Sequence, residues 1–226
     1  ATGILSVNDN ATVNLTTVSQ TALEINADDD SATNAVAGTL NLGIAFNQAG
    51  TITIDPSVVN TTDGFDTVNV TATAAITTGL DLITASTTNI NLFGTVAVAV
   101  DATTTGATLN AAGMSGVLTA TQTTGLLSVT GGSGNDVLNS TDATNTTAVV
   151  NAGAGNDTVS SGDGADTIVL GDGDDTVSDS GAGNDVITGG AGNDTVTSAG
   201  AGNDSIDGGT GNDNLTGGAG ADTIID

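Results

Sequence analysis

The chain has 226 residues, a net charge of −26, and no lysine, arginine, histidine, cysteine or tryptophan. The lack of basic residues excludes nucleic acid as a partner, because phosphate binding depends on lysine and arginine. Only 37% of the residues are hydrophobic and three are aromatic, so the composition fits stacked coils with narrow aliphatic ladders better than a globular core. No stretch approaches the roughly 18 consecutive apolar residues that a membrane span needs.

Residues 1–64 contain short segments in which apolar and polar residues alternate, including Ala11–Leu15, Gly38–Leu42 and Thr51–Ile54. Alternation with β-branched residues predicts strands. The segments are irregularly spaced, so this part is expected to form further coils, a cap over the end of a solenoid, or a small β-sandwich. Thr21–Glu24 could form a single turn of helix.

Residues 65–130 carry predicted strands at a spacing of about ten residues. Ten of the 26 acidic residues precede residue 131, and threonine, asparagine and alanine are frequent. The regular spacing continues into the next part of the chain, which predicts one solenoid whose turns are here closed by threonine, asparagine and glycine. The predicted strands are Thr67–Val70, Leu80–Ile83, Asn89–Leu92, Thr95–Val100, Ala107–Leu109, Val117–Ala120 and Leu126–Val129.

Residues 131–226 contain nine copies of the pattern G-G-x-G-x-D-x-U-x, where U is a large aliphatic residue. Every copy has an aspartate at its sixth position and an aliphatic residue at its eighth. A fixed period of this kind indicates a repeat architecture. The copies begin at Gly131, Ala152, Ser161, Leu170, Ser180, Gly189, Ala199, Gly208 and Gly217.

The two halves of the repeat predict a coil. Glycine tolerates positive φ and permits a tight turn, and x-U-x is a short strand whose middle side chain points inward. Two copies make one coil of about 18 residues, and successive coils stack as parallel strands. The aspartates of stacked turns then face each other across a gap, together with backbone carbonyls. Calcium prefers this mixture of hard oxygen ligands.

The pattern is similar to the calcium-binding repeat of the RTX (repeats-in-toxin) family, and the resemblance covers residues 131–225. It implies a Ca²⁺-bound β-roll in which the sixth-position carboxylates and the backbone of the first and third residues hold the ions. The predicted carboxylate ligands are Asp136, Asp157, Asp166, Asp175, Asp185, Asp194, Asp204, Asp213 and Asp222. The first and third residues of the copies are Gly131, Ser133, Ala152, Ala154, Ser161, Asp163, Leu170, Asp172, Ser180, Ala182, Gly189, Ala191, Ala199, Ala201, Gly208, Thr210, Gly217 and Ala219.

Sorting the copies by side gives two columns of turns. The first column starts at residues 131, 152, 170, 189 and 208, and the second at residues 161, 180, 199 and 217. Four gaps in one column and three in the other predict about seven ions. Ser140–Asn151 lacks the glycines and is expected to be a degenerate half-coil that binds calcium poorly or not at all. Asp179 and Ser198 each add one residue, which predicts a slight bulge.

Other acidic residues are expected to be solvated charges. Asp163, Asp172 and Asp174 would form an acidic rim on the turns, although they could also tune calcium affinity. Asp28–Asp30 could chelate calcium with Asn26 and Ser31, but a solvated charge run is the preferred interpretation. Asp63 and Asp66 form a weaker candidate of the same kind.

A second, looser resemblance lies in Gly64–Thr71, with the sequence GFDTVNVT. It is similar to a phrase found in bacterial surface-layer proteins and large RTX adhesins, and the whole chain resembles a bacterial surface-layer or RTX extracellular structural protein. This resemblance implies an extracellular or cell-surface location, with export by type I secretion.

Catalysis is not expected. General acid–base and nucleophilic chemistry usually recruits histidine, lysine, cysteine or tyrosine, and the chain has none of them. Paired carboxylates alone could serve a glycosidase, but sugar sites are typically lined by aromatic residues, which are nearly absent here.

The predicted fold is therefore all-β, a parallel β-solenoid. It comprises a β-rich part in residues 1–64, a calcium-poor solenoid in residues 65–130 and a calcium-binding β-roll in residues 131–226. The predicted function is that of a secreted structural protein that folds on calcium and self-assembles into a surface layer or extracellular matrix filament. Its predicted partners are copies of itself, with cell-surface polysaccharide as a second candidate. Two alternatives stay open: an adhesin stalk or binding module, and a secretion and folding module of a larger RTX enzyme.

Overall fold

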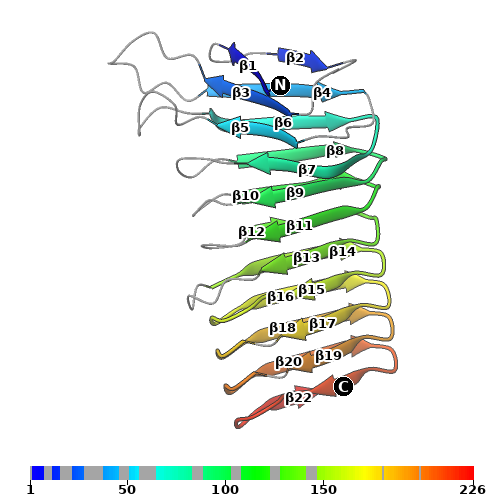
Figure 1. Ribbon diagram of the computed structural model, residues 1–226. Coiled ribbons are helices and arrows are strands. Elements are labelled where there is room, and N and C mark those ends of the chain that lie inside the picture. The colour runs from blue at the N-terminus through cyan, green and yellow to red at the C-terminus, as the bar shows by residue number, and fades with distance from the viewer. Residues whose placement is uncertain are drawn as a thin grey trace.

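The computed structural model describes residues 2–7, 12–15, 22–27, 38–45, 51–55, 65–82, 89–102, 108–122, 128–140, 147–179, 181–198 and 200–226. These residues form two parallel sheets of eleven strands each, which face each other along the length of the molecule (Figure 1). Successive strands alternate between the two sheets, so each strand pairs with the strand two places further along the chain. This arrangement confirms the predicted all-β parallel solenoid, and no helix occurs in the described part of the chain.

The first sheet contains the odd-numbered strands. They are β1 (Thr2–Val7), β3 (Ala22–Ala27), β5 (Thr51–Asp55), β7 (Ile76–Leu82), β9 (Val98–Ala102), β11 (Leu118–Gln122), β13 (Val137–Ser140), β15 (Thr158–Ser160), β17 (Thr176–Asp179), β19 (Thr195–Ser198) and β21 (Asn214–Thr216).

The second sheet contains the even-numbered strands. They are β2 (Thr12–Leu15), β4 (Gly38–Ile44), β6 (Phe65–Ala72), β8 (Asn89–Gly94), β10 (Thr108–Met114), β12 (Ser128–Thr130), β14 (Val149–Ala154), β16 (Thr167–Asp172), β18 (Val186–Ala191), β20 (Ser205–Thr210) and β22 (Thr223–Ile225).

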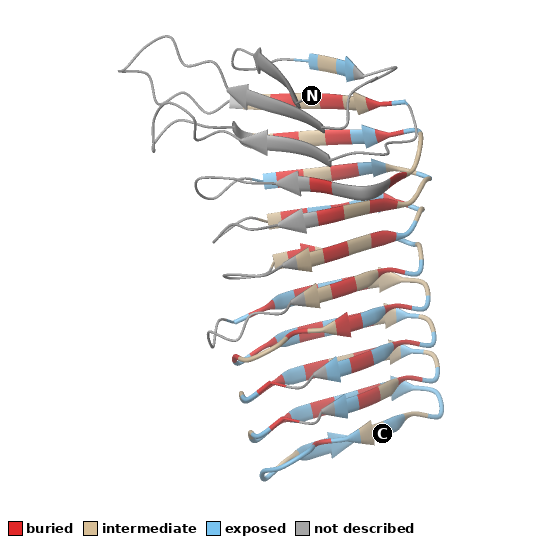
Figure 2. Cartoon of the chain, viewed as in Figure 1, coloured by how far each residue is buried: buried red, intermediate tan, exposed pale blue. Residues whose placement is uncertain are grey.

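The core is a pair of aliphatic ladders, one from each sheet. Buried and exposed residues alternate along the strands, because neighbouring side chains point to opposite faces (Figure 2). The ladder of the even-numbered strands runs through Leu40, Val68, Ile90, Leu109, Val129, Val150, Ile168, Ile187 and Ile206. The ladder of the odd-numbered strands includes Leu80, Val100, Ala120, Leu138, Val159, Val177 and Val196.

The eighth-position aliphatic residues of the repeats form the C-terminal part of both ladders, as predicted. Each contributes roughly 1.5–3 kcal/mol by full burial. Burial decreases at the last two copies, because Leu215 is partly buried and the side chain of Ile224 is 45% exposed.

Several local predictions differ from the structure. Ala22–Glu24 lies in β3 rather than in a helical turn, because Leu23 and Glu24 pair with Ile52 and Thr53 of β5. Thr95–Ala97, predicted as the start of a strand, is the turn between β8 and β9. The single-residue insertions produce no bulge in the paired strands, since Asp179 and Ser198 lie opposite each other and lengthen β17 and β19.

The strands of residues 1–64 belong to the same two sheets as the rest of the chain. In the first sheet the neighbouring strands follow the order β1, β3, β5 and β7. In the second sheet they follow the order β2, β4 and β6. This is the arrangement of further coils, one of the three predicted alternatives. The domain boundaries at residues 64 and 130 stay predictions, since the order of strands continues across both positions. Asp28–Asp30 and Asp63 lie outside the described residues.

Candidate calcium sites

The repeat turns form two columns, as their spacing predicted. The first column joins even-numbered to odd-numbered strands, and the second joins odd-numbered to even-numbered strands (Figure 1). Inter-turn hydrogen bonds define both columns. The amide of Gly155 donates to the carbonyl of Asp172 at 2.8 Å in the first column, and the amide of Gly164 donates to that of Ala182 at 3.0 Å in the second.

Glycine is required in these turns because adjacent turns lie in contact. Gly173 has a φ of 142°, which L-side chains rarely adopt. A Cβ atom added at Gly173 would also collide with the carbonyl oxygen of Gly155 in the preceding turn. Gly192 stands in the same relation to Gly173. The close stacking explains the fourth-position glycines and brings the oxygen atoms of successive turns together.

Every sixth-position aspartate from Asp136 to Asp204 is at most 3% exposed. One carboxylate oxygen, Oδ1, accepts a hydrogen bond from the backbone amide at the equivalent place in the preceding coil. These bonds form a ladder along each column. In the first column the pairs are Asp136–Asp157 (2.7 Å), Asp157–Asp175 (2.7 Å), Asp175–Asp194 (2.9 Å) and Asp194–Asp213 (2.9 Å). In the second they are Asp166–Asp185 (2.8 Å), Asp185–Asp204 (2.9 Å) and Asp204–Asp222 (3.0 Å).

The second carboxylate oxygen, Oδ2, provides the strongest indication of a cation. It is buried without a hydrogen-bond partner in several of these aspartates. An unpaired buried charge is costly, so such a group needs a partner. A cation between the turns meets this need, and the donor set is one that calcium accepts. The aspartates concerned are Asp157, Asp166, Asp175, Asp194 and Asp213.

The position of Oδ2 relative to the first residue of the repeat is visible at Gly189. A Cβ atom added there would lie 2.5 Å from Asp194 Oδ2 and would collide with the carbonyl oxygen of Gly208 in the next turn. Gly131 has the same relation to Asp136 Oδ2, at 2.7 Å, and to the carbonyl of Ala152. A carboxylate oxygen and a first-position carbonyl therefore face the same space between two turns.

Burial raises the pKa of the aspartates at these sites. It raises the pKa of Asp157 to about 6, with the neighbouring carboxylates Asp136 and Asp175 adding to the effect and a backbone hydrogen bond opposing it. The pKa values of Asp136, Asp166, Asp175 and Asp194 are raised for the same main reason. The aspartates whose Oδ2 has no partner, such as Asp157, thus carry a charge that the folded protein alone does not compensate.

The third-position carbonyls take part in the ladder between turns. Those of Asp172, Ala182, Ala191, Ala201, Thr210 and Ala219 each accept an amide from the fourth residue of the preceding turn. A carbonyl has a second lone pair, so these bonds leave each of them able to act as a ligand. Ser133 and Ala154 occupy the corresponding place in the first two turns of the first column.

Every first-position residue that the structure describes is buried. They include Ala152, Ser161 and Leu170, and the glycines at 131, 189, 208 and 217. Ser180 and Ala199 lie outside the described residues. No group of three or more acidic side chains that could hold a metal ion occurs among the residues with described positions. The ligand set stays a prediction.

The remaining acids on the turns are less buried. Asp172 and Asp174 are exposed, and Asp163 is half-buried with its Oδ1 accepting the amide of Ala182 at 3.0 Å. Asp174 belongs to a feature that the pattern did not predict, a ladder of exposed fifth-position side chains. Each side-chain oxygen accepts the amide of the next turn, which reverses the direction of the sixth-position ladder. The donor–acceptor pairs in the first column are Asn156–Asn135, Asp174–Asn156, Asn193–Asp174 and Asn212–Asn193.

That ladder had a signal in the sequence. The fifth position is asparagine or aspartate in seven of the nine copies, although the pattern G-G-x-G-x-D-x-U-x leaves it undefined. Both residue types have a side-chain oxygen at the length needed to reach a neighbouring backbone amide.

Of the degenerate segment Ser140–Asn151, the structure describes Ser140 and residues 147–151, and the latter lead into and begin β14. Ala148 takes the place of the sixth-position aspartate, and its amide donates to Asp166 Oδ1 at 2.6 Å. The backbone amide of Thr167 donates to the carbonyl of Ala148 at 2.9 Å. In the same way, the backbone amide of Thr158 donates to the carbonyl of Asp136 at 2.8 Å. Since Ala148 has no carboxylate, the gap between it and Asp166 lacks one of the predicted ligands.

A ladder of asparagine side chains joins strands of the N-terminal and middle coils. In each bond a side-chain Nδ2 donates to the side-chain Oδ1 of an asparagine in the preceding coil. The donor–acceptor pairs are Asn69–Asn41 (2.8 Å), Asn91–Asn69 (2.9 Å) and Asn110–Asn91 (3.3 Å). This ladder of hydrogen bonds joins four strands of one sheet, β4, β6, β8 and β10. Because the ladder lies within the strands, the expectation that threonine, asparagine and glycine close the turns in place of calcium stays a prediction.

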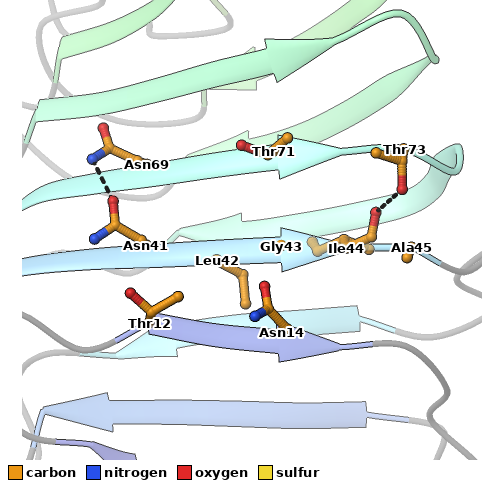
Figure 3. Close-up of a pocket in the computed structure, with 10 residues that line it drawn as sticks. All are labelled: Thr12, Asn14, Asn41, Leu42, Gly43, Ile44, Ala45, Asn69, Thr71 and Thr73. Atoms are coloured by element: carbon orange, nitrogen blue, oxygen red, sulfur yellow. Dashed lines mark hydrogen bonds between the residues drawn. The ribbon is translucent and has the colours of Figure 1, made fainter.

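The amide ladder begins beside a groove of about 480 Å³ over β2, β4 and β6 (Figure 3). Thr12, Asn14, Asn41, Asn69 and Thr71 contribute polar side chains to its lining. Among the described residues, none that lines the groove is charged.

Comparison with known proteins supports the assignment of the turns. The model of the RTX calcium-binding nonapeptide repeat matches in four copies, over residues 128–147, 142–177, 179–199 and 198–224. No curated protein and no solved structure matches the chain. In the described part of the chain, no helix is long and apolar enough to cross a membrane. The C-terminal part of this chain, within residues 128–224, matches the RTX calcium-binding nonapeptide repeat, and its strands are stacked as a β-solenoid.

Proposed function

We infer that the chain is a calcium-binding extracellular structural protein, because RTX-type repeats stacked in a β-solenoid suggest that class of protein. We propose, more specifically, that the chain is a secreted protein whose repeat region folds when calcium binds and which then assembles with copies of itself into a surface layer or matrix filament. The row of buried carboxylate oxygens without partners carries this proposal, because it links folding of the turns to a cation.

In this proposal each ion lies between two stacked turns. The Oδ2 atom of a sixth-position aspartate and the first-position carbonyl of the next turn bind it, and third-position carbonyls complete the shell. Calcium supplies positive charge that compensates the buried carboxylates. The protein contributes a preformed spacing between turns, which the aspartate Oδ1 bonds and the glycine contacts maintain.

The energetics make calcium a folding ligand. Extracellular calcium modules bind with dissociation constants of about 10⁻⁴ to 10⁻³ M. At a calcium concentration of ten times that constant, each site adds about 1.4 kcal/mol to the folded state. About seven sites would add roughly 10 kcal/mol, comparable to the net stability of a whole domain. The repeats would stay unfolded in a calcium-poor cytosol and fold outside the cell, which suits type I secretion.

The charge of the chain makes self-assembly depend on cations. No lysine or arginine is available to pair with the 26 acidic residues. Two copies therefore repel each other unless cations bridge their acidic rims, as at the exposed residues Asp172 and Asp174. A calcium requirement for assembly as well as for folding is the expected result.

The test is a calcium titration of the full chain, followed by circular dichroism and by light scattering with negative-stain electron microscopy. We expect the β-sheet signal to rise with calcium to about 10 mM, assemblies to form, and both to reverse with chelator. Magnesium at equal concentration is the matched ionic control, because it demands a stricter geometry than calcium. A chain that folds with calcium yet stays monodisperse would contradict self-assembly and favour an adhesin stalk or a secretion and folding module.

A further inference from the structure

The first calcium turn adjoins a coil whose equivalent position is apolar. In the first column of turns, the place of the sixth-position aspartate is taken in successive earlier coils by Ile76, Val98 and Leu118. All three are at most 2% exposed. The column therefore changes from aliphatic side chains to carboxylates between Leu118 and Asp136.

Both carboxylate oxygens of Asp136 are hydrogen-bonded within the protein. Its Oδ1 accepts the amide of Leu118 at 2.7 Å, and its Oδ2 accepts the amide of Gly132 at 2.9 Å. In the same column Asp157, Asp175 and Asp194 have an Oδ2 without a hydrogen-bond partner. The first turn thus has less need of a cation than the turns that follow it.

The backbone of this turn explains the difference. The second and fourth glycines of the later turns in the column have φ values between 94° and 150°. Gly132 and Gly134 do not adopt positive φ in this range. The different conformation at Gly132 directs its amide to Asp136 within the same turn.

The first turn is bonded to the apolar coil that precedes it. The backbone amide of Ser133 donates to the carbonyl of Met114 at 3.0 Å. Gly134 lies against the carbonyl of Gly116, where a Cβ atom would be 2.6 Å from that oxygen. β13 then pairs in register with β11. These contacts involve no carboxylate other than Asp136.

We propose that the turn Gly131–Asp136 folds without calcium, as the last turn of the calcium-poor solenoid, and is the template on which the calcium turns form. In a solenoid each repeat contacts only its neighbours, so folding extends most readily from a repeat that is already folded. Calcium-driven folding then proceeds from residue 131 toward the C-terminus. The inference rests on calcium binding by the repeats and is independent of self-assembly.

Amide hydrogen exchange of the full chain, resolved by NMR, tests the template directly. In calcium-free protein the amides of Leu118 and Gly132, which donate to Asp136, exchange at least about a hundredfold slower than unprotected amides. The amides of Asp157 and Asp175, which donate to the next aspartates of the column, exchange as unprotected amides until calcium is added. Equal protection of all four amides without calcium, or of none, would overturn the proposal.

A pair of matched variants tests the direction of folding. Asp136→Ala removes the acceptor at the template, and Asp213→Ala removes the equivalent acceptor near the other end of the column. Asp136→Ala is expected to raise the calcium midpoint for protection of the Asp175 amide severalfold, and Asp213→Ala to raise it less. A larger effect of Asp213→Ala would show that folding starts from the C-terminal end and would overturn the proposal. Protection of the Val98 amide in calcium-free samples reports whether each variant keeps the N-terminal coils.

Discussion

Replacing a sixth-position aspartate by asparagine should change stability in opposite directions with and without calcium. Asp175 is the best position, because its Oδ1 accepts the Asp157 amide at 2.7 Å while its Oδ2 is buried without a partner. The Asp175→Asn side chain keeps an oxygen for the Asp157 amide and removes the buried negative charge. It also removes one carboxylate from the proposed calcium shell.

The two effects have comparable magnitudes. An unsatisfied buried polar group costs about 1–3 kcal/mol, and more when it is charged, so Asp175→Asn should stabilise calcium-free coils by at least about 1 kcal/mol. Loss of one site removes about 1.4 kcal/mol at a calcium concentration of ten times the dissociation constant. The variant should therefore be the more stable protein in chelator and the less stable one in calcium.

The assay is urea unfolding followed by circular dichroism, with chelator or with about 10 mM calcium. An osmolyte such as TMAO in all samples favours the compact state and populates the calcium-free coils. Asp174→Asn is the matched control. Asp174 is the exposed neighbour, and its Oδ1 accepts the Asn193 amide at 2.7 Å. A change of the same sign in both conditions for Asp175→Asn would refute the assignment of Oδ2 as a calcium ligand.

Three further predictions concern acid, the turns and the core. Burial raises the pKa of Asp157 to about 6, above its value of about 3.9 in an unfolded chain. Calcium-free coils should therefore gain stability as pH falls from 7 to 4 and lose it as pH rises through 6, which circular dichroism in chelator would detect; a gain toward higher pH would contradict the burial of these carboxylates. Gly173→Ala should destabilise the repeats even in saturating calcium, because the residue has a φ of 142° and no room for a Cβ atom; an unchanged urea midpoint would refute the stacking of turns. Ile187→Ala should cost about 2–5 kcal/mol, whereas Ile224→Ala should cost much less since its side chain is 45% exposed; equal losses would show that the aliphatic ladder does not form the core.

The repeat pattern predicted most of the architecture because each of its positions has one dominant physical constraint. The fourth glycine is required where turns touch, as at Gly173 and Gly155, and the eighth residue fills the core, as at Ile187. A period that carries both constraints defines the coil and its two columns of turns. The same periodicity places the aspartates in register.

Other features could not be read from the pattern because they depend on contacts between coils. The hydrogen bond from Gly132 to Asp136 distinguishes the first turn from the later turns of its column, although its sequence GGSGND fits the repeat. The Asn41–Asn69–Asn91 ladder joins residues more than 20 positions apart, in strands whose register no periodicity defines. In β3, helix-forming residues such as Ala22 and Glu24 adopt a strand because β1 and β5 pair with it on both sides.

The central claim is that calcium binds between stacked turns and thereby folds the repeat region. Isothermal calorimetry of the full chain, with circular dichroism at the same calcium concentrations, measures stoichiometry and folding together. The account predicts about seven ions per chain, bound in the same concentration range in which the β-sheet signal appears. A repeat region that is fully folded in chelator, or calcium binding that leaves the β-sheet signal unchanged, would contradict it.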